Sequence, residues 1–304
     1  MTKLGSDNKP PEFSLVMPAK NEGPSLQKLL PKLIADYPKA EIIVVNDGST
    51  DNTIEVCSQY PVKLITHPYS MGNGSAIKTG ARNSSHDKIV FMDADGQHNP
   101  DDILRLIATM DEGYEMVVGA RQPSSHASLW RRLANASYNK LASMMTGHQV
   151  QDLTSGFRVA RTRHFRKFLY LLPNGFSYPT TCTMAFFRSG MPVGYIPIQA
   201  SQREGKSHIR PLRDGSRFFI IILKIGALFS PMRLFLPIAA ALFSIGICYY
   251  IYTFASVGRF TNMSALLFTS SLLTFLIGIL SEQVSSLHYK EAQEDVRRTS
   301  RDDV

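Results

Sequence analysis

The stretch VFMDADGQHNPDD, residues 90–102, places two carboxylates one residue apart where a hydrophobic run ends. Alternate residues of a strand point to opposite faces, so Asp93 and Asp95 share one side and Ala94 takes the other. A turn followed by a helix cap explains GQHNPDD, but it does not explain two acids on one face. Their repulsion raises a carboxyl pKa unless a cation lies between them. Oxygen ligands of this kind suit Mg²⁺ or Mn²⁺, with water and a diphosphate completing the coordination.

Strand-like runs alternate with helical patterns on both sides of this stretch. The runs are FSLVMPA (13–19), EIIVVND (41–47), VKLITH (62–67), KIVFMD (88–93) and EMVVGA (115–120). Helical patterns begin near Ser25, Asp51, Asn73 and Pro100. This alternation predicts an α/β fold with a mostly parallel sheet and helices on both faces. Ligands bind at the carboxyl ends of such strands, so MPAKNE, NDGSTD and DADGQ should converge on one crevice.

Two further polar segments have both a structural and a ligand-binding interpretation. In NDGSTD (46–51), Asp47 and Gly48 suit a turn, and Thr50 or Asp51 suits a helix cap. A carboxylate such as Asp47 can also accept a hydrogen bond from the ring N–H of uracil or guanine. In SMGNGSAIKTGA (70–81), the glycines either begin a helix or leave backbone N–H groups facing an anion.

The C-terminal third contains two long uncharged segments. Residues 234–254 and 263–280 carry no charge, and about 20 such residues span a bilayer. A buried helical hairpin is the alternative. RFFIIILKIGALF (217–229) predicts a helix in the membrane interface, or else a buried helix of the preceding domain. Basic residues lie before the first span and after the second, so the positive-inside rule places both termini in the cytoplasm. FSLVMPA is too short for a secretory signal and is followed by KNE.

The charge and cysteine content narrow the possible partners. The 304 residues carry a formal charge of +8, which suits nucleic acid, anionic lipid or a phosphate-bearing substrate. Basic residues beside the spans favour lipid or phosphate, and no nucleic-acid-binding motif is present. Cys57, Cys182 and Cys248 lack metal-site spacing and fit a reducing compartment.

Seven segments in a fixed order resemble the family 2 glycosyltransferases, which have the GT-A fold. They are VMPAKNE, VVNDGSTD, MGNGSAIKTG, MDADGQHNP, GAR, DLTSGFR and REGKSH. Within the family the chain is most similar to polyprenyl-phosphate sugar synthases over residues 13–230, and its paired spans resemble members with a membrane hairpin. The resemblance implies an inverting, metal-dependent enzyme with its catalytic domain in the cytoplasm. Its donor would be a UDP- or GDP-linked sugar and its acceptor undecaprenyl or dolichyl phosphate.

The same resemblance implies a domain order and a role for individual residues. The expected domains are a loose N-terminus (1–12), a GT-A domain (13–212), an interfacial helix (213–230), two transmembrane helices (231–287) and a charged cytoplasmic tail (288–304). The nucleotide pocket would comprise Pro18, Ala19, Asn21, Glu22, Asp47, Asp93, Arg203 and Lys206. The metal would be held by Asp93, Asp95 and Gln97, and the acceptor phosphate by Arg121, Arg131 and Asn135. The candidate catalytic residues are Asp95, Arg121, Arg131 and Asp152.

The chemistry of a phosphate acceptor fits these basic residues. The second pKa of a phosphate monoester is about 6, so the acceptor is mostly dianionic at neutral pH and needs no general base. It does need cations that hold two anions together, which GAR and WRR provide unless Arg131 and Arg132 are only solvated helix charges. Asp152 could orient an arginine or the sugar, or cap a turn. Segment 176–183, FSYPTTCT, is expected to form loops around the sugar.

Three other functions are compatible with parts of this pattern. Transfer to a sugar hydroxyl would need a base, for which Asp152 is the only candidate. A processive polysaccharide synthase would carry a Q-x-x-R-W segment and more spans, and the chain has neither. A non-catalytic nucleotide-sugar sensor could lose the acids or arginines, which are all present. A homo-oligomer is possible, and the sequence leaves the oligomeric state open.

Overall fold

The computed structural model describes residues 11–122, 129–175, 177–199 and 226–302, with side chains described outside 129–135 and 288–302. Several predicted site residues therefore lie outside the described part: Arg203 and Lys206 entirely, and the side chains of Arg131 and Asn135. Most of the expected interfacial helix, 213–225, also lies outside it. The chain forms two compact units. The first comprises Met1–Asn139 and Val150–Lys206, and the second comprises Lys140–Gln149 and Ser207–Val304.

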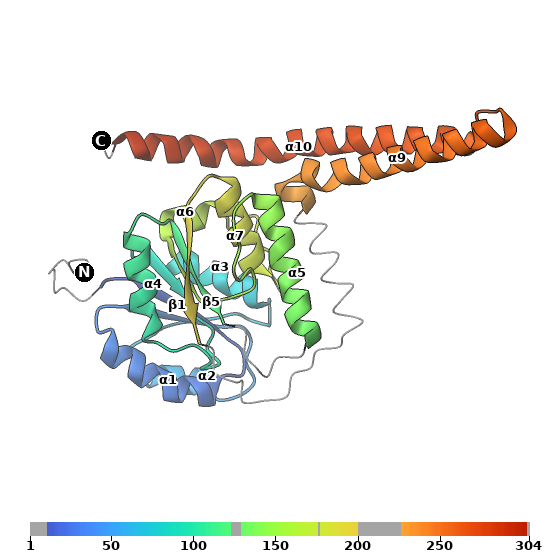
Figure 1. The fold of residues 1–304 in the computed structure, drawn as a ribbon. Coiled ribbons are helices and arrows are strands. Elements are labelled where there is room, and N and C mark those ends of the chain that lie inside the picture. The colour runs from blue at the N-terminus through green and yellow to red at the C-terminus, as the bar shows by residue number, and fades with distance from the viewer. Residues whose placement is uncertain (1–10, 123–128, 176, 200–225, 303–304) are drawn as a thin grey trace. The chain divides into compact units, whose positions relative to one another are not determined.

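The first unit is built on a seven-stranded, mostly parallel sheet (Figure 1). Its strands are β1 (Ser14–Ala19), β2 (Glu41–Asn46), β3 (Lys63–Thr66), β4 (Lys88–Phe91), β5 (Met116–Arg121), β6 (Arg158–Arg161) and β7 (Val193–Ile198). Their order in the sheet is β3-β2-β1-β4-β6-β5-β7, and β6 runs antiparallel to both of its neighbours. β2 and β3 lie on one side of β1, and β4 lies on the other side, so the strand order reverses at β1. Sheets of this kind bind ligands at such a switch point.

Helices cover both faces of the sheet. They are α1 (Gly23–Asp36), α2 (Thr53–Ser58), α3 (Asn73–Asn83), α4 (Asp102–Asp111), α5 (Leu129–Thr146), α6 (Thr162–Lys167) and α7 (Tyr178–Arg188). Helix α4 shows why these segments fold as they do: Ile103, Leu106, Ile107 and Met110 recur at the spacing of one helical face, and all four are buried. The leucines of α1 join the same core on that face of β1, β2 and β4.

The opposite face of the sheet packs on α3, α6 and α7. Gly80 of α3 lies against Val16 of β1 so closely that a Cβ would sit 2.2 Å from a Val16 methyl. Phe91 of β4 packs on Phe165 of α6 and Tyr178 of α7, with ring centroids 4.4 and 6.4 Å apart. The sheet is therefore buried on both sides, as continuous apolar strands predict.

One element of this unit differs from the sequence-based expectation. The 176–183 segment was expected to form sugar-facing loops, yet from Tyr178 onward it is the buried helix α7. Thr180, Thr181 and Thr183 are all buried.

Arg158 explains the hydroxyl that α7 carries at position 183. Its guanidinium is fully buried and donates to the Pro179 carbonyl (3.0 Å), to Thr183 Oγ1 (3.1 Å) and to the Ser155 carbonyl. Burying a cation costs free energy unless its N–H groups are bonded, and these bonds satisfy both terminal nitrogens, while Nε has no partner among the described residues. The hydroxyl of Thr183 therefore serves the interior of the protein.

The second unit contains the two apolar segments as a helical hairpin. Helix α9 (Pro231–Val257) and helix α10 (Asn262–Asp302) run side by side (Figure 1). Residues 231–257 and 262–287 are long and apolar enough to cross a membrane, and only 11% and 17% of their most apolar windows are buried. A buried hairpin was the alternative interpretation, and helices this exposed do not fit it. The expected charged tail continues α10 as far as Asp302.

Close contacts and polar side chains hold the hairpin together. Gly246 of α9 lies against Phe268, and Gly278 of α10 lies against Phe235, so small residues let the helices approach. Ser271 Oγ donates across the pair to the Ala239 carbonyl at 2.8 Å. At the base of the hairpin, the Arg233 guanidinium donates to the carbonyls of Met144 and Met145, at the C-terminal end of α5, which belongs to this unit.

Candidate active site

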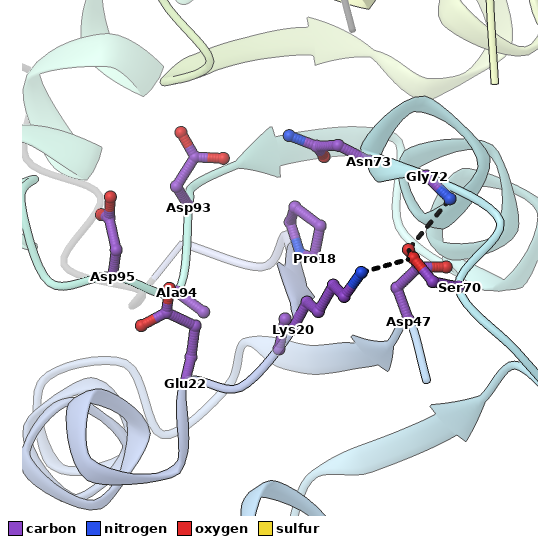
Figure 2. A pocket seen from close by; sticks show the side chains of 11 residues that line it. Pro18, Lys20, Glu22, Asp47, Ser70, Gly72, Asn73, Asp93, Ala94 and Asp95 are labelled. Atoms are coloured by element: carbon purple, nitrogen blue, oxygen red, sulfur yellow. Dashed lines mark hydrogen bonds between the residues drawn. The ribbon is translucent and has the colours of Figure 1, made fainter. Parts of the chain in front are cut away.

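A polar pocket of about 490 Å³ opens at the carboxyl ends of β1, β2 and β4. It is lined by Pro18, Ala19, Lys20, Glu22, Asp47, Ser70, Gly72, Asn73, Asp93, Ala94 and Asp95 (Figure 2). This size suits a cofactor or nucleotide. The three predicted segments MPAKNE, NDGSTD and DADGQ therefore do converge, because parallel strands bring their carboxyl ends to one edge.

The lining has an excess of negative charge. Among the described residues that line it, four carboxylates, from Glu22, Asp47, Asp93 and Asp95, face the pocket with one ammonium, that of Lys20. An anionic ligand such as a diphosphate cannot enter this set favourably unless a cation accompanies it. The charge balance thus favours a divalent ion together with a phosphate-bearing ligand.

Asp93 and Asp95 lie together along one wall of the pocket (Figure 2). Gly96 has φ +71°, a conformation that glycine adopts readily, and the turn that it forms lets Asp95 Oδ1 accept the Gln97 backbone N–H at 3.1 Å. Among the described residues, Asp93 accepts no hydrogen bond, and the imidazole nitrogen Nε2 of His98 lies 3.9 Å from its Oδ2. The Asp93 side chain is 36% exposed, so its oxygens remain available to a ligand.

This acid pair fits a divalent metal of the Mg²⁺ or Mn²⁺ kind. In the described part of the chain, no three acidic, histidine or cysteine side chains cluster closely enough to enclose a metal alone. Mg²⁺ commonly takes one or two carboxylates and completes its coordination with water and substrate phosphates. Two carboxylates at the pocket wall match that requirement. Gln97, the third predicted ligand, is half-buried and does not line the pocket.

Asp47 is in a very different environment from Asp93. Its Oδ1 accepts from His67 Nδ1 (2.8 Å) and the Met71 N–H (2.7 Å), and its Oδ2 accepts from Ser70 Oγ (2.8 Å) and the Gly72 N–H (2.9 Å). Burial acts to raise the pKa of Asp47, but these hydrogen bonds, that of His67 foremost, outweigh burial and hold the pKa below its usual value. Asp47 therefore holds the 70–72 loop in place. Its predicted contact with a base stays a prediction.

The glycine-bearing start of α3 does not present its N–H groups to an anion. The N–H groups of Gly74 and Ser75 donate to the carbonyls of Gly175 (3.2 Å) and Asn174 (2.9 Å). A Cβ on Gly74 would lie 2.0 Å from the Pro173 carbonyl oxygen, so the 173–175 segment leaves room only for glycine. Of the two interpretations of this motif, the structure favours the helix start.

Arg121 and Asp152 form a two-point ion pair near the acid pair. Asp152 Oδ2 accepts from Arg121 Nε (2.8 Å), and Asp152 Oδ1 accepts from the terminal nitrogen Nη2 (3.1 Å). The N–H groups of Thr154 and Ser155 also donate to Asp152 Oδ1. Burial acts to raise the pKa of Asp152, but the hydrogen bonds and charge of Arg121 outweigh it and lower the pKa. Asp152 is thus a weak base that orients Arg121, one of the roles expected for it.

The segment after Asp152 connects this ion pair to the acid pair. A Cβ on Gly156 would lie 2.9 Å from Asp93 Oδ2, so glycine is required for this approach. Burial acts to lower the pKa of Arg121, while Asp152 and then Asp93 raise it, and the net effect is upward. Arg121 and Asp93 are therefore within electrostatic reach of each other.

Apart from Gln97, Arg121 and Asp152, which are described above, the predicted site residues divide into three groups. Pro18, Ala19, Glu22, Asp47, Asp93 and Asp95 line the pocket. Asn21 does not: its Oδ1 accepts from the Thr50 N–H at 2.8 Å, which braces the neighbouring loop. Arg203 and Lys206, with the side chains of Arg131 and Asn135, lie outside the described residues.

Sequence reasoning missed two residues of this site. Lys20, inside the MPAKNE segment, lines the pocket and donates to Ser70 Oγ at 2.9 Å. His67 directly follows β3 and bonds both Asp47 and Thr79 Oγ1 (2.9 Å). Its place at a strand end, like that of the three polar segments, was the signal that could have revealed it.

Comparison with known families agrees with the fold and the pocket. The profile of glycosyl transferase family 2 matches residues 14–169, just over half of the chain. The chain belongs to glycosyltransferase family 2. A second profile, the GtrB C-terminal hairpin, matches residues 230–287, which contain α9 and the apolar part of α10. This glycosyltransferase therefore carries a hairpin suited to anchoring it in a membrane.

Individual relatives cover different shares of the glycosyltransferase. The chain is 25% identical to glycosyltransferase AglJ of Haloferax volcanii over 93% of its own length and 96% of that protein. It is 33% identical to an undecaprenyl-phosphate 4-deoxy-4-formamido-L-arabinose transferase of Proteus mirabilis, over 50% of this chain and about half (49%) of that protein. Glucosyl-3-phosphoglycerate synthase of Mycobacterium tuberculosis, solved with Mn²⁺ and UDP, superposes with a TM-score of 0.54 at 21% identity, over 70% of this chain and 78% of that one. That likeness confirms the predicted GT-A fold.

Proposed function

We propose that this glycosyltransferase moves a sugar from a nucleoside-diphosphate sugar to a polyprenyl phosphate and produces a polyprenyl-monophosphate sugar. The observation that carries the proposal is the proximity of two kinds of site. The pocket-lining Asp93–Asp95 pair suits a metal-bound diphosphate, and Arg121, oriented by Asp152, suits a second phosphate. Relatives named as undecaprenyl-phosphate sugar transferases and the membrane hairpin support a lipid acceptor.

The donor would lie across the pocket with its diphosphate beside the acid pair. Asp93 and Asp95 would hold Mg²⁺ or Mn²⁺, which neutralises charge on the leaving diphosphate when bound. Pro18, Ala19 and Glu22 would line the nucleoside part. Arg203 and Lys206 are proposed to contact the diphosphate as well, as the family resemblance implies.

The acceptor phosphate would bind Arg121, with Arg131 and Asn135 as further contacts. The two-point bond to Asp152 fixes the plane of the Arg121 guanidinium, and its Nη2 also donates to Thr154 Oγ1 at 2.7 Å. A phosphate oxygen then attacks the anomeric carbon while the bond from that carbon to the donor diphosphate breaks. The stereochemical inversion is implied by the family. No proton needs to be removed, because the acceptor is already a dianion.

The state of Asp152 argues against the alternative acceptor. Transfer to a sugar hydroxyl requires a base that takes a proton, and Asp152 was the only candidate. Its oxygens accept six hydrogen bonds from Arg121, Thr154 and Ser155, and its pKa is lowered. A carboxylate in that environment orients a cation better than it accepts a proton.

Catalysis is also proposed to occur at the cytoplasmic membrane surface, with both termini on that side.

Purified full-length protein, incubated with a panel of nucleotide sugars, tests the proposal. Release of UDP or GDP should require both a divalent metal and undecaprenyl or dolichyl phosphate. Arg131→Ala should raise the KM for the lipid phosphate while leaving nucleotide affinity unchanged. Arg82 is an exposed arginine of α3, and the control substitution Arg82→Ala should change neither quantity. Turnover that needs a glycan hydroxyl and ignores the lipid phosphate would refute the proposal.

A further inference from the structure

Lys20 is the only cationic side chain among the described residues that line the pocket. It follows β1 directly, and its Nζ lies 2.9 Å from Ser70 Oγ. Figure 2 shows the side chain extending toward Ser70 and Asp47, away from Asp93 and Asp95. If the acid pair holds the diphosphate, the ammonium of Lys20 lies toward the nucleoside half of the ligand. The inference therefore rests on the proposed donor site.

The neighbours of Lys20 have few hydrogen-bonding groups left for a base. Each oxygen of Asp47 already accepts two hydrogen bonds, which fills the roughly four lone-pair positions of a carboxylate. The Ser70 hydroxyl donates to Asp47 and accepts from Lys20, and the Gly72 N–H donates to Asp47. These groups bond one another and leave the ligand little to contact.

Lys20 itself retains donors. An ammonium group has three N–H bonds and no acceptor, and the hydrogen bonds of the described residues use one of them, to Ser70. Asn73 also faces the pocket, but its amide both donates and accepts. Asn73 can thus serve any base, whereas Lys20 can serve only a ligand atom that accepts.

Bases differ at the position where such a donor would act. Uracil and guanine carry a carbonyl oxygen, O4 or O6, where cytosine and adenine carry an amino group that is itself a donor. A site that offers a fixed donor discriminates strongly against a ligand that lacks the matching acceptor. The cation of Lys20 strengthens this effect, because charge-assisted hydrogen bonds are stronger than neutral ones.

We propose that Lys20 determines nucleotide specificity: its ammonium donates to the carbonyl oxygen of the donor base and selects uracil and guanine over cytosine and adenine. Ser70 positions the ammonium, and Asp47, held by His67, positions Ser70. The nucleoside is then recognised by a lysine that the Asp47 network holds in place.

Equilibrium binding of free nucleoside diphosphates to the full chain in detergent, with Mg²⁺ or Mn²⁺ present, tests this proposal. UDP is compared with CDP, and GDP with ADP, so that ring size is matched within each pair. The wild type should prefer the keto member. Lys20→Met should reduce that preference about tenfold, as expected for the loss of a hydrogen bond from a charged donor. Lys20→Arg should retain most of it.

The control is Lys28→Met, the same substitution at an exposed lysine of α1 that does not line the pocket. It should leave all four affinities unchanged. If Lys20→Met weakens both members of a pair by the same factor, the ammonium binds phosphate or ribose and the proposal is wrong. An unchanged preference would also overturn it while leaving the proposed function intact. Failure of the wild type to bind any of the four nucleotides would refute the proposed function as well.

Discussion

Asp47 and Asp93 line the same pocket and have opposite surroundings. The Asp47 side chain is 5% exposed and its oxygens accept four hydrogen bonds, two of them from backbone N–H groups. The Asp93 side chain is 36% exposed, and no hydrogen bond from the described residues reaches it. Both acids follow a buried strand and both precede a turn, so the sequence presents them as equivalent.

The difference teaches which carboxylate can bind a ligand. A carboxylate whose lone pairs are filled by protein donors stabilises the loop that it holds. A carboxylate that lies beside a second acid and accepts no hydrogen bond from the protein is stabilised most by an external cation. Asp47 therefore contributes to the shape of the pocket, and Asp93 contributes negative charge to it. In the proposed donor complex, Asp47 would lie toward the nucleoside and Asp93 toward the diphosphate.

Asp93→Asn should have the largest effect on turnover. The substitution preserves shape but removes the charge that would hold the metal, so sugar transfer should fall at least about 100-fold. The thermal unfolding midpoint should not fall, because no hydrogen bond from a described residue is lost. Turnover and thermal unfolding of the same preparation check both statements. Turnover at the wild-type rate would show that the acid pair is not the metal site.

Asp47→Asn should reverse that pattern and reduce stability. An amide has one acceptor oxygen, and its NH₂ group would replace the other oxygen and face one of the two backbone N–H groups that now donate to Asp47, which costs about 2 kcal/mol. The thermal unfolding midpoint should fall clearly. Asp36→Asn, at an exposed position of α1, serves as the matched control and should leave the midpoint unchanged. Equal midpoints for the two variants would contradict the assigned role of Asp47.

Gly156→Ala sharpens the comparison without touching either acid. The new methyl group would lie 2.9 Å from Asp93 Oδ2 and displace that carboxylate, so we expect roughly tenfold slower transfer, an effect of about 1.4 kcal/mol. Because a carboxylate can rotate away, stability should change little. Gly175→Ala, where a Cβ meets nothing within 4 Å, is the control. Equal rates for both variants would show that the position of Asp93 is not critical.

The smallest effect is a dependence of stability on acid pH. The pKa of Asp47 is lower in the folded protein than its ordinary value near 4, so its stabilising contribution is present above that value. As the pH falls through the folded pKa, the carboxylate is protonated and the contribution is lost. The gap in unfolding midpoint between wild type and Asp47→Asn should therefore be constant from about pH 7 to 5 and narrow below 4. A gap that persists at pH 3 would mean that Asp47 acts by another route.

Much of this site could be predicted because its residues lie at the carboxyl ends of strands or just after them. Hydrophobic runs set the strands, parallel strands bring their carboxyl ends together, and Pro18, Asp47 and Asp93 therefore had to meet. Helix α7 could not be predicted in this way. Its threonines resemble a polar loop in the sequence, and only the tertiary structure shows what they bond: Thr183 accepts from the buried Arg158, and Thr180 accepts from Tyr138.

The sequence by itself determined the α/β class, the convergence of the acidic segments and the two spans, because periodicity and length act along the chain. The tertiary structure decided what each polar group does. Asp47, Lys20 and Asp152 obtain their roles from partners 20 to 50 residues away, namely His67, Ser70 and Arg121. Hydrogen-bonding capacity is finite, and only the folded arrangement shows which donors and acceptors are already used and which remain for a ligand.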